Sequence, residues 1–189
     1  MVRLVVATAQ KKFEEFAYVL HYRLRSSSKT VRGRSGNIVE AVGESHFTLL
    51  ELLAFPHVTF EVGERVYIGK EKRDKIISVL GKLKYNDLSP AAKNELLNVI
   101  ETVIKRNEKR FVNYFNTLQP VTPRLHALEL IPGIGKTLTR IILEERERKP
   151  FESFKDIEER IGFKEPEKQV AKRIIEELKG ARIAIFVRR

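Results

Sequence analysis

The residue pattern with the clearest chemistry is a short turn that places two glycines directly before a basic helical segment. The glycines are Gly133 and Gly135, and the segment opens with Lys136 and Thr137 and carries Arg140 one turn later. Glycine lets a backbone adopt positive φ and approach another molecule closely, because it has no Cβ. The first amides of a helix lack intrahelical acceptors and stand at the positive end of its dipole. This corner is therefore predicted to bind an oxygen anion, most commonly a nucleic-acid phosphate.

Two other interpretations of the same turn compete with phosphate binding. The run Gly135-Lys136-Thr137 resembles the end of a P-loop, but that motif requires a glycine at position 130, where this chain has leucine. The segment 123–130 also has a helical pattern, whereas a P-loop follows a strand. The sequence thus excludes a P-loop and leaves open a helix–turn–helix that serves only packing or protein contact.

The turn and its flanking apolar positions resemble the helix-hairpin-helix motif of sequence-independent nucleic-acid-binding proteins. The matching residues are Leu128, Ile131, Pro132, Gly133, Ile134 and Gly135, followed by Leu138, Ile141 and Ile142. In that motif the hairpin amides hold a backbone phosphate, sometimes together with a bound monovalent cation. By position, the resemblance assigns phosphate contacts to Gly133, Ile134, Gly135, Lys136, Thr137 and Arg140. Thr139 departs from the motif, which usually has a small apolar residue there.

A second basic cluster lies in the Ser/Gly-rich segment 23–36. It holds five basic residues and no acidic ones: Arg23, Arg25, Lys29, Arg32 and Arg34. Such a composition cannot form a core, so the segment is predicted to be a mobile loop between the first two strands. One interpretation is a nucleic-acid-binding arm that lies along phosphates, and the other is a solvated surface loop.

The remaining titratable residues show no catalytic arrangement. The chain has no cysteine, and its four histidines are scattered without the spacing of metal ligands. Glutamates such as Glu144 and Glu145 alternate with Arg and Lys at helical spacings, which is typical of a salt-bridged surface. The resemblance to helix-hairpin-helix glycosylases fails because Thr137 stands at the place of their lysine and Asp156 fits a helix cap. We therefore expect no enzymatic activity, no cofactor and no bound metal.

The charge of the chain favours a polyanionic partner. Its 189 residues include 36 Lys and Arg against 25 Asp and Glu, which gives a net charge of +11. The excess is spread over both halves of the sequence, and a positive surface attracts polyanions. Residues 1–10 contain an apolar run too short for a signal sequence or a membrane span. A cytoplasmic protein with no membrane partner is therefore predicted.

The elements that must position these residues begin with a β-rich part, assigned to residues 1–88. Strands are predicted over 13–25, 47–55, 58–62, 65–69 and 76–83, with turn signals between them. Short strands with glycine turns at this length favour a small OB-like β-barrel, with another small β fold as the alternative. In an OB-like barrel, Phe47, Phe60 and Tyr67 are candidate platforms for stacked bases unless they belong to the core.

The rest of the chain is predicted to be helical apart from its end. Ser89-Pro90 starts a single amphipathic connecting helix of about 28 residues within the range 89–121. Residues 122–180 form a helix-hairpin-helix domain with two tandem motifs, and residues 181–189 supply a C-terminal strand. The predicted fold class is thus α+β: a small OB-like β-barrel followed by an α-helical domain with tandem helix-hairpin-helix motifs.

Four segments together resemble an uncharacterised archaeal family of predicted RNA-binding proteins, which combine an OB-like barrel with a helix-hairpin-helix unit. They are residues 62–69 (VGERVYIG), 118–120 (LQP), the hairpin, and 149–154 (KPFESF). The resemblance implies nucleic-acid binding, with RNA favoured over DNA, and no established activity. We therefore expect a non-catalytic nucleic-acid-binding protein. The alternative is a protein-binding adaptor in a translation or transcription assembly, with ribosomal or transcription proteins as partners.

Overall fold

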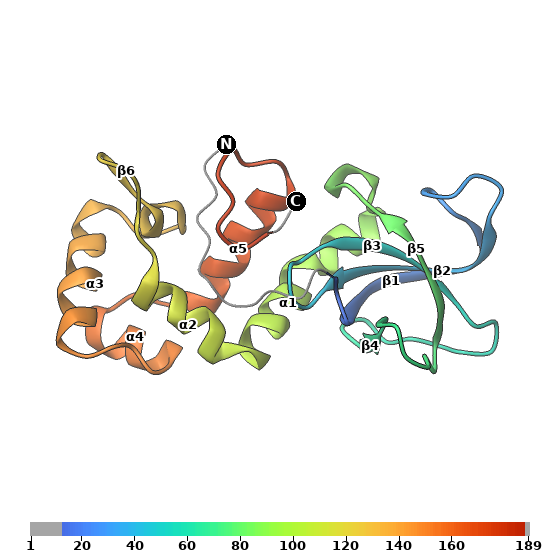
Figure 1. Ribbon diagram of the computed structural model, residues 1–189, viewed down its shortest axis with the longest axis horizontal. Helices are drawn as coiled ribbons and strands as arrows, with labels where there is room; N and C mark the ends of the chain where they lie inside the picture. Colours follow the sequence, from blue (N-terminus) through green and yellow to red (C-terminus); the bar gives the residue numbers. More distant parts are fainter. Residues whose placement is uncertain (1–12, 188–189) are drawn as a thin grey trace.

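The computed structural model describes residues 13–187. A curled antiparallel sheet of five strands lies at one end of an elongated molecule, and five α-helices extend from it to the other end (Figure 1). At this level the predicted α+β class is confirmed. The predicted ranges that begin at residue 1 or end at residue 189 reach into residues 1–12 and 188–189, which lie outside the described part.

The sheet has an open curl. Its strands are β1 Phe16–Ser27, β2 Ser35–Gly43, β3 Leu49–Ala54, β4 Arg65–Tyr67 and β5 Ile76–Lys82. Their order is β4-β1-β2-β3-β5, and every neighbouring pair is antiparallel. The edge strands β4 and β5 do not pair with each other, so the curl is not closed by hydrogen bonds between them.

Two parts of the strand prediction are wrong. Residues 35–43 form the central strand β2, which was not predicted, and its first two residues, Ser35 and Gly36, are part of the predicted loop. This strand is paired on both sides and almost wholly buried, so it lacks the polar alternation of a half-exposed strand. Residues 58–62 are irregular, and the chain hydrogen-bonds to Val19 of β1 only at Gly63 and Glu64.

The predicted connecting helix is in fact two helices. α1 Pro90–Arg106 starts at the predicted Ser89 cap, whose hydroxyl accepts an amide of the first turn at 3.2 Å. α2 Glu108–Thr117 follows after Asn107, whose φ of −114° and ψ of 33° end the first helical path. The Asn107 side chain donates to the Val103 carbonyl at 2.9 Å. Such local side-chain hydrogen bonds make Asn a poor residue inside a helix. The 3-10 helix η1 Tyr85–Asp87 precedes α1.

The helix predicted over 123–130 is also wrong. The chain forms instead a two-stranded ribbon and a 3-10 turn: β6 Pro120–Thr122, β7 Leu125–His126 and η2 Ala127–Leu130. The His126 ring accepts the Leu128 amide at 3.1 Å, and the Glu129 carboxylate accepts the His126 amide at 3.0 Å. A short strand thus precedes the turn after all, and only the missing glycine at position 130 still argues against a P-loop.

The C-terminal part contains α3 Lys136–Arg148, α4 Phe154–Ile161 and α5 Pro166–Leu178, but the predicted terminal strand is wrong for residues 181–187. The amides of Ile185, Phe186 and Val187 all donate to the buried carboxylate of Glu177, at 2.8, 3.0 and 2.8 Å. Successive residues of a strand face opposite ways, so three consecutive amides that converge on one carboxylate cannot belong to a strand.

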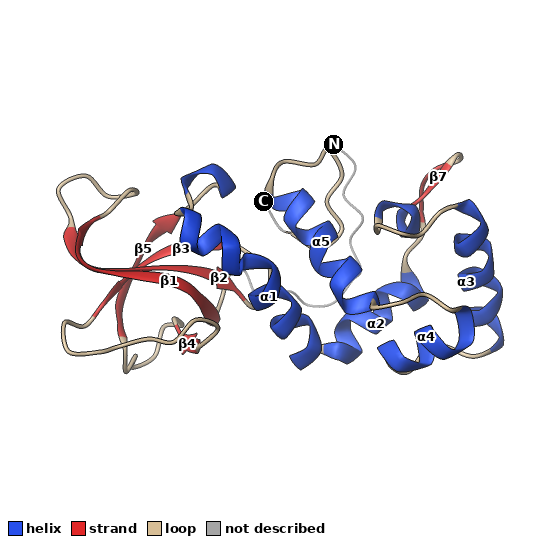
Figure 2. Cartoon of the chain, turned by 180° about the vertical axis from the view of Figure 1, so that it is seen from behind, coloured by secondary structure: helices blue, strands red, loops and turns tan. Residues whose placement is uncertain are grey.

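One apolar core joins the sheet to the helices. The face of the sheet enclosed by its curl holds a separate cluster that includes Val19, Leu52 and Phe60. On the other face, Tyr18 and Leu20 belong to a cluster that continues through α1 and α2 to α3, α4 and α5. Figure 2 shows these helices extending away from the sheet. The turn before α3 is therefore fixed to the same core as the sheet. Across the described residues, no helix combines the length and apolar character needed to cross a bilayer.

Candidate nucleic-acid interface

The two glycines of the turn before α3 have different roles. Gly133 has φ +86°, and a Cβ there would lie 3.2 Å from the Phe163 ring. Gly135 has φ −101°, and a Cβ there would meet open space. Gly133 is thus required by the backbone and by packing, whereas Gly135 leaves room for an approaching ligand. Ile131 and Ile134 are buried and anchor the turn to the core, so Ile134 can contribute only its backbone to a site.

The main-chain amides of this turn are available. The first hydrogen bond of α3 runs from the Thr139 amide to the Gly135 carbonyl at 2.9 Å. Among the amides before it that have no acceptor in the described part of the chain, four belong to exposed residues: Gly133, Gly135, Lys136 and Thr137. Because α3 presents its positive dipole end at the same place, this corner can hold an anion.

Two cations flank these amides. Lys136 and Arg140 are exposed, and neither forms an ion pair with a described residue. The exposed Thr137 adds a hydroxyl donor. The structure therefore brings together the hairpin residues that the sequence predicted, with charges and donors of the kind that contact a phosphate.

A second turn, residues 162–166, lies against the first because Phe163 packs on Gly133. Its electrostatics are different, since the Glu165 amide donates to the Glu158 carboxylate at 2.6 Å. Glu165 also stands at the start of α5 and forms an ion pair with Lys168 at 3.1 Å. Two carboxylates at this helix start disfavour a phosphate, so the second turn supports the first one and does not duplicate it.

Arg146, near the far end of α3, holds the corner in place. Its guanidinium donates to the carbonyls of Phe115 and Leu118 at 3.2 and 2.9 Å, which ties α3 to the end of α2. Burial, followed by the nearby charge of Arg146, lowers the pKa of His126. The neutral His126 ring can therefore accept the amide that closes η2, directly before the turn.

The second predicted cluster includes the loop between β1 and β2, and the first residues of this loop are folded against the sheet. The fully buried Glu51 carboxylate accepts the amides of Lys29 and Thr30, both at 2.9 Å. It also accepts the hydroxyls of Ser28 and Thr30, both at 2.6 Å. Burial alone would raise the pKa of Glu51, but these hydrogen bonds outweigh it and hold the pKa below its usual value. This part of the loop is thus an anion site that the chain fills with its own carboxylate.

Lys29 is a structural cation, which corrects its predicted role. Its ammonium donates at 2.8 Å to Glu40, which is fully buried directly opposite Glu51 in the sheet. Burial would raise the pKa of Glu40, but hydrogen bonds from Lys29 and Ser89 hold it below its usual value. Moving Lys29 to a phosphate would leave a buried carboxylate without its cation, at a large cost in stability.

The four arginines of this cluster are not gathered at the hairpin. Arg23 and Arg25 lie on β1, and the Nε and Nη2 atoms of Arg23 are buried without a described partner. Arg32 and Arg34 are exposed in the loop between β1 and β2. This loop, in blue, and α3 lie at opposite ends of the molecule (Figure 1). The structure therefore separates the two sets of predicted contacts.

Two of the predicted stacking platforms are core residues. Phe47 is fully buried, and Phe60 is only 7% exposed. Tyr67 packs edge-on against Phe16, with ring centroids 5.3 Å apart. The phenylalanine ring that does face solvent beside the sheet is Phe13, which is 70% exposed.

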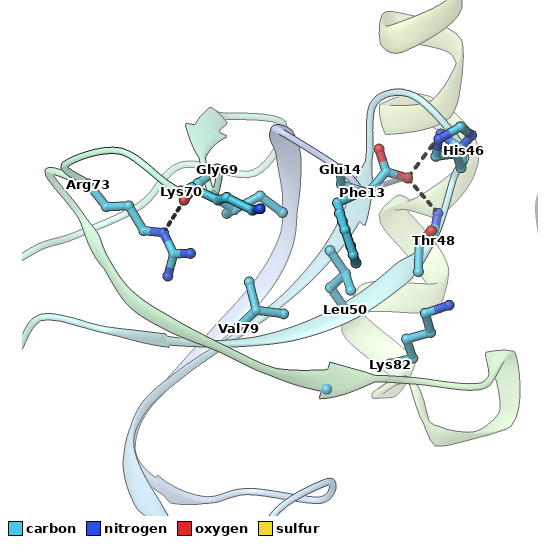
Figure 3. A pocket seen from close by; sticks show the side chains of 12 residues that line it. Phe13, Glu14, His46, Thr48, Leu50, Gly69, Lys70, Arg73, Val79 and Lys82 are labelled. Atoms are coloured by element: carbon cyan, nitrogen blue, oxygen red, sulfur yellow. Dashed lines mark hydrogen bonds between the residues drawn. The ribbon is translucent and has the colours of Figure 1, made fainter. Parts of the chain in front are cut away.

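Phe13 lines a cavity of about 650 Å³ between the two edges of the open sheet (Figure 3). Basic residues from the β4 side and from β5 line it as well: Lys70, Arg73 and Lys82. No sequence pattern indicated the whole cavity, because its lining comes from four separate segments that strand pairing and the curl of the sheet bring together. The run Lys70-Glu71-Lys72-Arg73 is the one local pattern that marks part of it.

No metal-binding constellation is present among residues 13–187, where no group of three His, Asp or Glu side chains could hold an ion. Ser89 and His21 do approach each other, with Oγ 3.5 Å from Nδ1. The Ser89 hydroxyl, however, donates directly to the Glu40 carboxylate at 2.5 Å and also caps α1. A nucleophilic triad places the histidine between serine and carboxylate, so this cluster has a structural arrangement.

Comparison with known proteins places the chain among archaeal relatives. Residues 13–188 match the family model described as "Protein of unknown function (DUF655)". The uncharacterised protein MJ0038 of Methanocaldococcus jannaschii is 50% identical over 168 residues, 89% of this chain and 76% of that protein. The crystal structure of Af1531 from Archaeoglobus fulgidus, 42% identical, has a TM-score of 0.84 and covers 93% of this chain and 100% of its own. The predicted uncharacterised archaeal family is confirmed, whereas RNA binding stays a prediction.

Proposed function

The chain belongs to the DUF655 family, and we propose that it is a non-catalytic protein that binds the phosphate backbone of nucleic acid through the turn before α3. One observation carries this proposal. The amides of Gly133, Gly135, Lys136 and Thr137 belong to exposed residues and have no acceptor among the described residues. Lys136 and Arg140 stand beside them without ion pairs to described residues. A phosphate diester supplies the missing acceptor and the missing negative charge together.

The proposed binding has no base specificity at this corner. Amides and lysines that contact phosphates fix the position of a strand but do not read its bases. A net charge of +11 adds long-range attraction for any polynucleotide. The preference for RNA over DNA rests on the family resemblance given above, since the turn offers the same donors to either backbone.

Two finer assignments of the fold accompany this proposal. The sheet fits an OB-like barrel left open on one side, because β1 pairs with both β2 and β4, and β3 pairs with both β2 and β5. The units η2–α3 and α4–α5 fit tandem helix-hairpin-helix motifs, because Phe163 of the second turn packs on Gly133 of the first. In this assignment the first helix of the first motif is reduced to one 3-10 turn.

A protein-binding adaptor is the second candidate, and one surface favours it. Leu24 and Ile77 are 62% and 40% exposed, and with Leu53 they line a depression of about 420 Å³. Exposed apolar groups of this kind mark protein contacts when they form a patch. An adaptor would bind free RNA weakly and would retain a protein of a translation or transcription assembly in pull-downs.

Charge reversal at the turn tests the leading proposal. Lys136→Glu removes a cation beside the amides and puts a carboxylate at the mouth of the site. We expect at least a tenfold loss of affinity for duplex and single-stranded RNA alike, measured by fluorescence anisotropy at about 100 mM salt. The slope of log affinity against log salt should also become shallower by about 1 or more, because fewer counterions are released.

The matched control is Lys155→Glu on α4, since this side chain is 82% exposed and the change in net charge is the same. It should lower affinity by no more than about threefold, because screening weakens charges beyond roughly 10 Å. Equal losses in both variants would mean that only net charge matters and would contradict a site at the turn. Strong retention of one protein partner by a chain that does not bind RNA would favour the adaptor.

A further inference from the structure

The cavity at the open side of the sheet has an aromatic wall and an apolar floor. Phe13 forms part of the wall, and this residue is 70% exposed. Leu50 and Ile68 contribute apolar surface, and Val79 of β5 is 38% exposed at the same cavity. Figure 3 shows Phe13 beside Leu50, with Val79 across from them. A volume of about 650 Å³ lies within the range of sites that hold one small organic group.

Three cations surround this apolar surface without ion pairs to described residues. Lys70 lies with its ammonium 5.9 Å from the centre of the Phe13 ring. Arg73 is held by hydrogen bonds to the carbonyls of Gly69 and Ile77, at 2.8 and 3.2 Å, through Nε and Nη1. Its Nη2 has no described acceptor, and neither has the ammonium of the exposed Lys82. The cavity thus places the fixed charge of Arg73 and the flexible charges of two lysines around an aromatic ring.

The one carboxylate in the lining is already engaged. Glu14 accepts the amides of Ser45, His46 and Thr48, at 2.7, 2.9 and 3.3 Å. These hydrogen bonds direct the carboxylate to the segment between β2 and β3 and compensate its charge (Figure 3). The field inside the cavity is therefore positive, and an anionic group fits it better than a cationic or neutral one.

We infer that this cavity binds an unpaired nucleotide of a single-stranded nucleic acid, with the base on Phe13 and its phosphate among Lys70, Arg73 and Lys82. The inference rests on the proposed nucleic-acid binding and adds a strand class to it. A nucleotide combines a flat base that can stack on an aromatic ring with a phosphate that accepts several hydrogen bonds, and the cavity offers a partner for each. A base inside a duplex has both faces covered by its neighbours, so only an unpaired base can stack on a protein ring. The turn before α3 lacks such a ring and holds phosphates of either strand class.

The test compares two probes with the full chain. The first is a labelled oligouridylate of about 12 nucleotides, and the second is an RNA duplex of about 12 base pairs. Phe13→Ala and Lys70→Glu should each lower the affinity for oligouridylate about tenfold and leave the duplex affinity unchanged. Phe13→Tyr retains a stacking ring and should bind as the unmodified chain does. Lys72→Glu is the matched control, because Lys72 is exposed in the same segment but does not line the cavity.

A fluorescent base gives a second readout. A 2-aminopurine within the oligouridylate should be quenched on binding, and Phe13→Ala should abolish the part of the quenching that stacking causes. Circular dichroism at the same temperature confirms that each variant is folded, which we expect because Phe13 and Lys70 are exposed.

The possible outcomes separate the two proposals. If both cavity variants bind oligouridylate like the unmodified chain while Lys136→Glu still loses affinity, the cavity assignment is overturned and the turn stands. If the cavity variants lose affinity for oligouridylate and Lys136→Glu does not, the cavity stands and the turn fails. Equal loss for both probes in the cavity variants overturns the cavity assignment, since it shows a general charge effect. Unchanged binding in every variant overturns both.

Discussion

Two anion cradles in this molecule differ in whether the chain fills them. At the start of the loop between β1 and β2, the amides of Lys29 and Thr30 and two hydroxyls surround the buried Glu51 carboxylate. At the turn before α3, the amides of Gly133 to Thr137 that precede the first helical hydrogen bond face no described acceptor, apart from that of Ile134. The sequence predicted phosphate contacts at both places. The two places differ in the position of the nearest carboxylate, and we propose that an external anion takes the place of Glu51 at the turn before α3.

The C-terminal segment resembles the Glu51 cradle, because a buried carboxylate of the chain accepts its amides. Three consecutive amides donate there to Glu177, a residue that is 1% exposed. A carboxylate on a neighbouring element thus fixes each of these two irregular segments to the fold. The turn before α3 is irregular as well, yet apolar packing through Ile131 and Ile134 fixes it instead. Its amides, except that of Ile134, therefore have no acceptor among the described residues.

Emptying the filled cradle should give the largest effect. Glu51→Ala leaves two amides and two hydroxyls without their buried acceptor, while the Lys29 ammonium keeps its contact with Glu40. We expect the free energy of unfolding to fall by about 3 kcal/mol, measured by urea denaturation. Added inorganic phosphate should restore part of this loss by occupying the vacated cradle. Glu61→Ala at an exposed position is the control and should change stability by less than about 0.5 kcal/mol. A loss no larger than that of the control would contradict the proposed role of Glu51.

Lowering the pH should also destabilise the fold through the Glu51 cradle, with a smaller loss of stability than Glu51→Ala causes. The pKa values of Glu40 and Glu51 are lowered in the folded chain from a usual value of 4.5, so their contribution is present above pH 4.5. It is lost as the pH falls through the lowered values. The pKa of Glu177 is raised by burial, so its effect has the opposite sign and lowers stability as the pH rises above 4.5. Glu51→Gln should flatten the acid limb of a plot of melting temperature against pH; an unchanged limb would count against the assignment.

A matched pair of glycine variants probes the open cradle. Gly133→Ala should lower the free energy of unfolding by about 1–2 kcal/mol, because φ is +86° and the new Cβ would meet Phe163 at 3.2 Å. Gly135→Ala should leave stability within about 0.5 kcal/mol, since φ is −101° and the space is open. It should nevertheless weaken RNA binding a few fold, because the methyl group stands where a phosphate approaches. Full RNA affinity in Gly135→Ala would show that no ligand comes close to this backbone.

The smallest effect is expected at the exposed end of the loop between β1 and β2. The double variant Arg32→Glu/Arg34→Glu should lower the affinity for duplex RNA by no more than about threefold at roughly 0.15 M salt, where distant charges are screened. Lys136→Glu should cost at least three times as much in the same anisotropy assay. A larger loss in the arginine variant would reverse the comparison and move the site to the sheet.

The sequence predicted what depends on neighbouring residues. The Ser89 cap, the glycine turn and the exposed cations Lys136 and Arg140 are local patterns, and the structure has them where they were expected. The break at Asn107 was also local, but its single polar residue was hidden in an otherwise continuous apolar stripe. In this chain, a local sequence pattern predicted the role of a residue correctly only where no residue distant in the sequence binds the same group.

What the sequence could not show depends on groups far apart in the chain. Lys29 carried the right charge for a phosphate, yet Glu40 and Glu51, brought close by strand pairing, occupy its ammonium and its amide. The apolar run 183–187 had the pattern of a strand, but Glu177 holds its amides. Phe13 and Lys70 lie close together because β1 pairs with β4, and the curl of the sheet brings Val79 and Lys82 of β5 to the same cavity.

The difference between the two cradles can be measured directly at their amides. Nitrogen-15 correlation spectra of the full chain, recorded while duplex RNA is added at low salt, report each amide separately. We predict that the resonances of Gly133, Gly135, Lys136 and Thr137 shift most, while those of Lys29 and Thr30 stay in place because Glu51 already holds them. Shifts concentrated at Lys29 and Thr30, or none at the turn before α3 under conditions where RNA binds, would contradict the account.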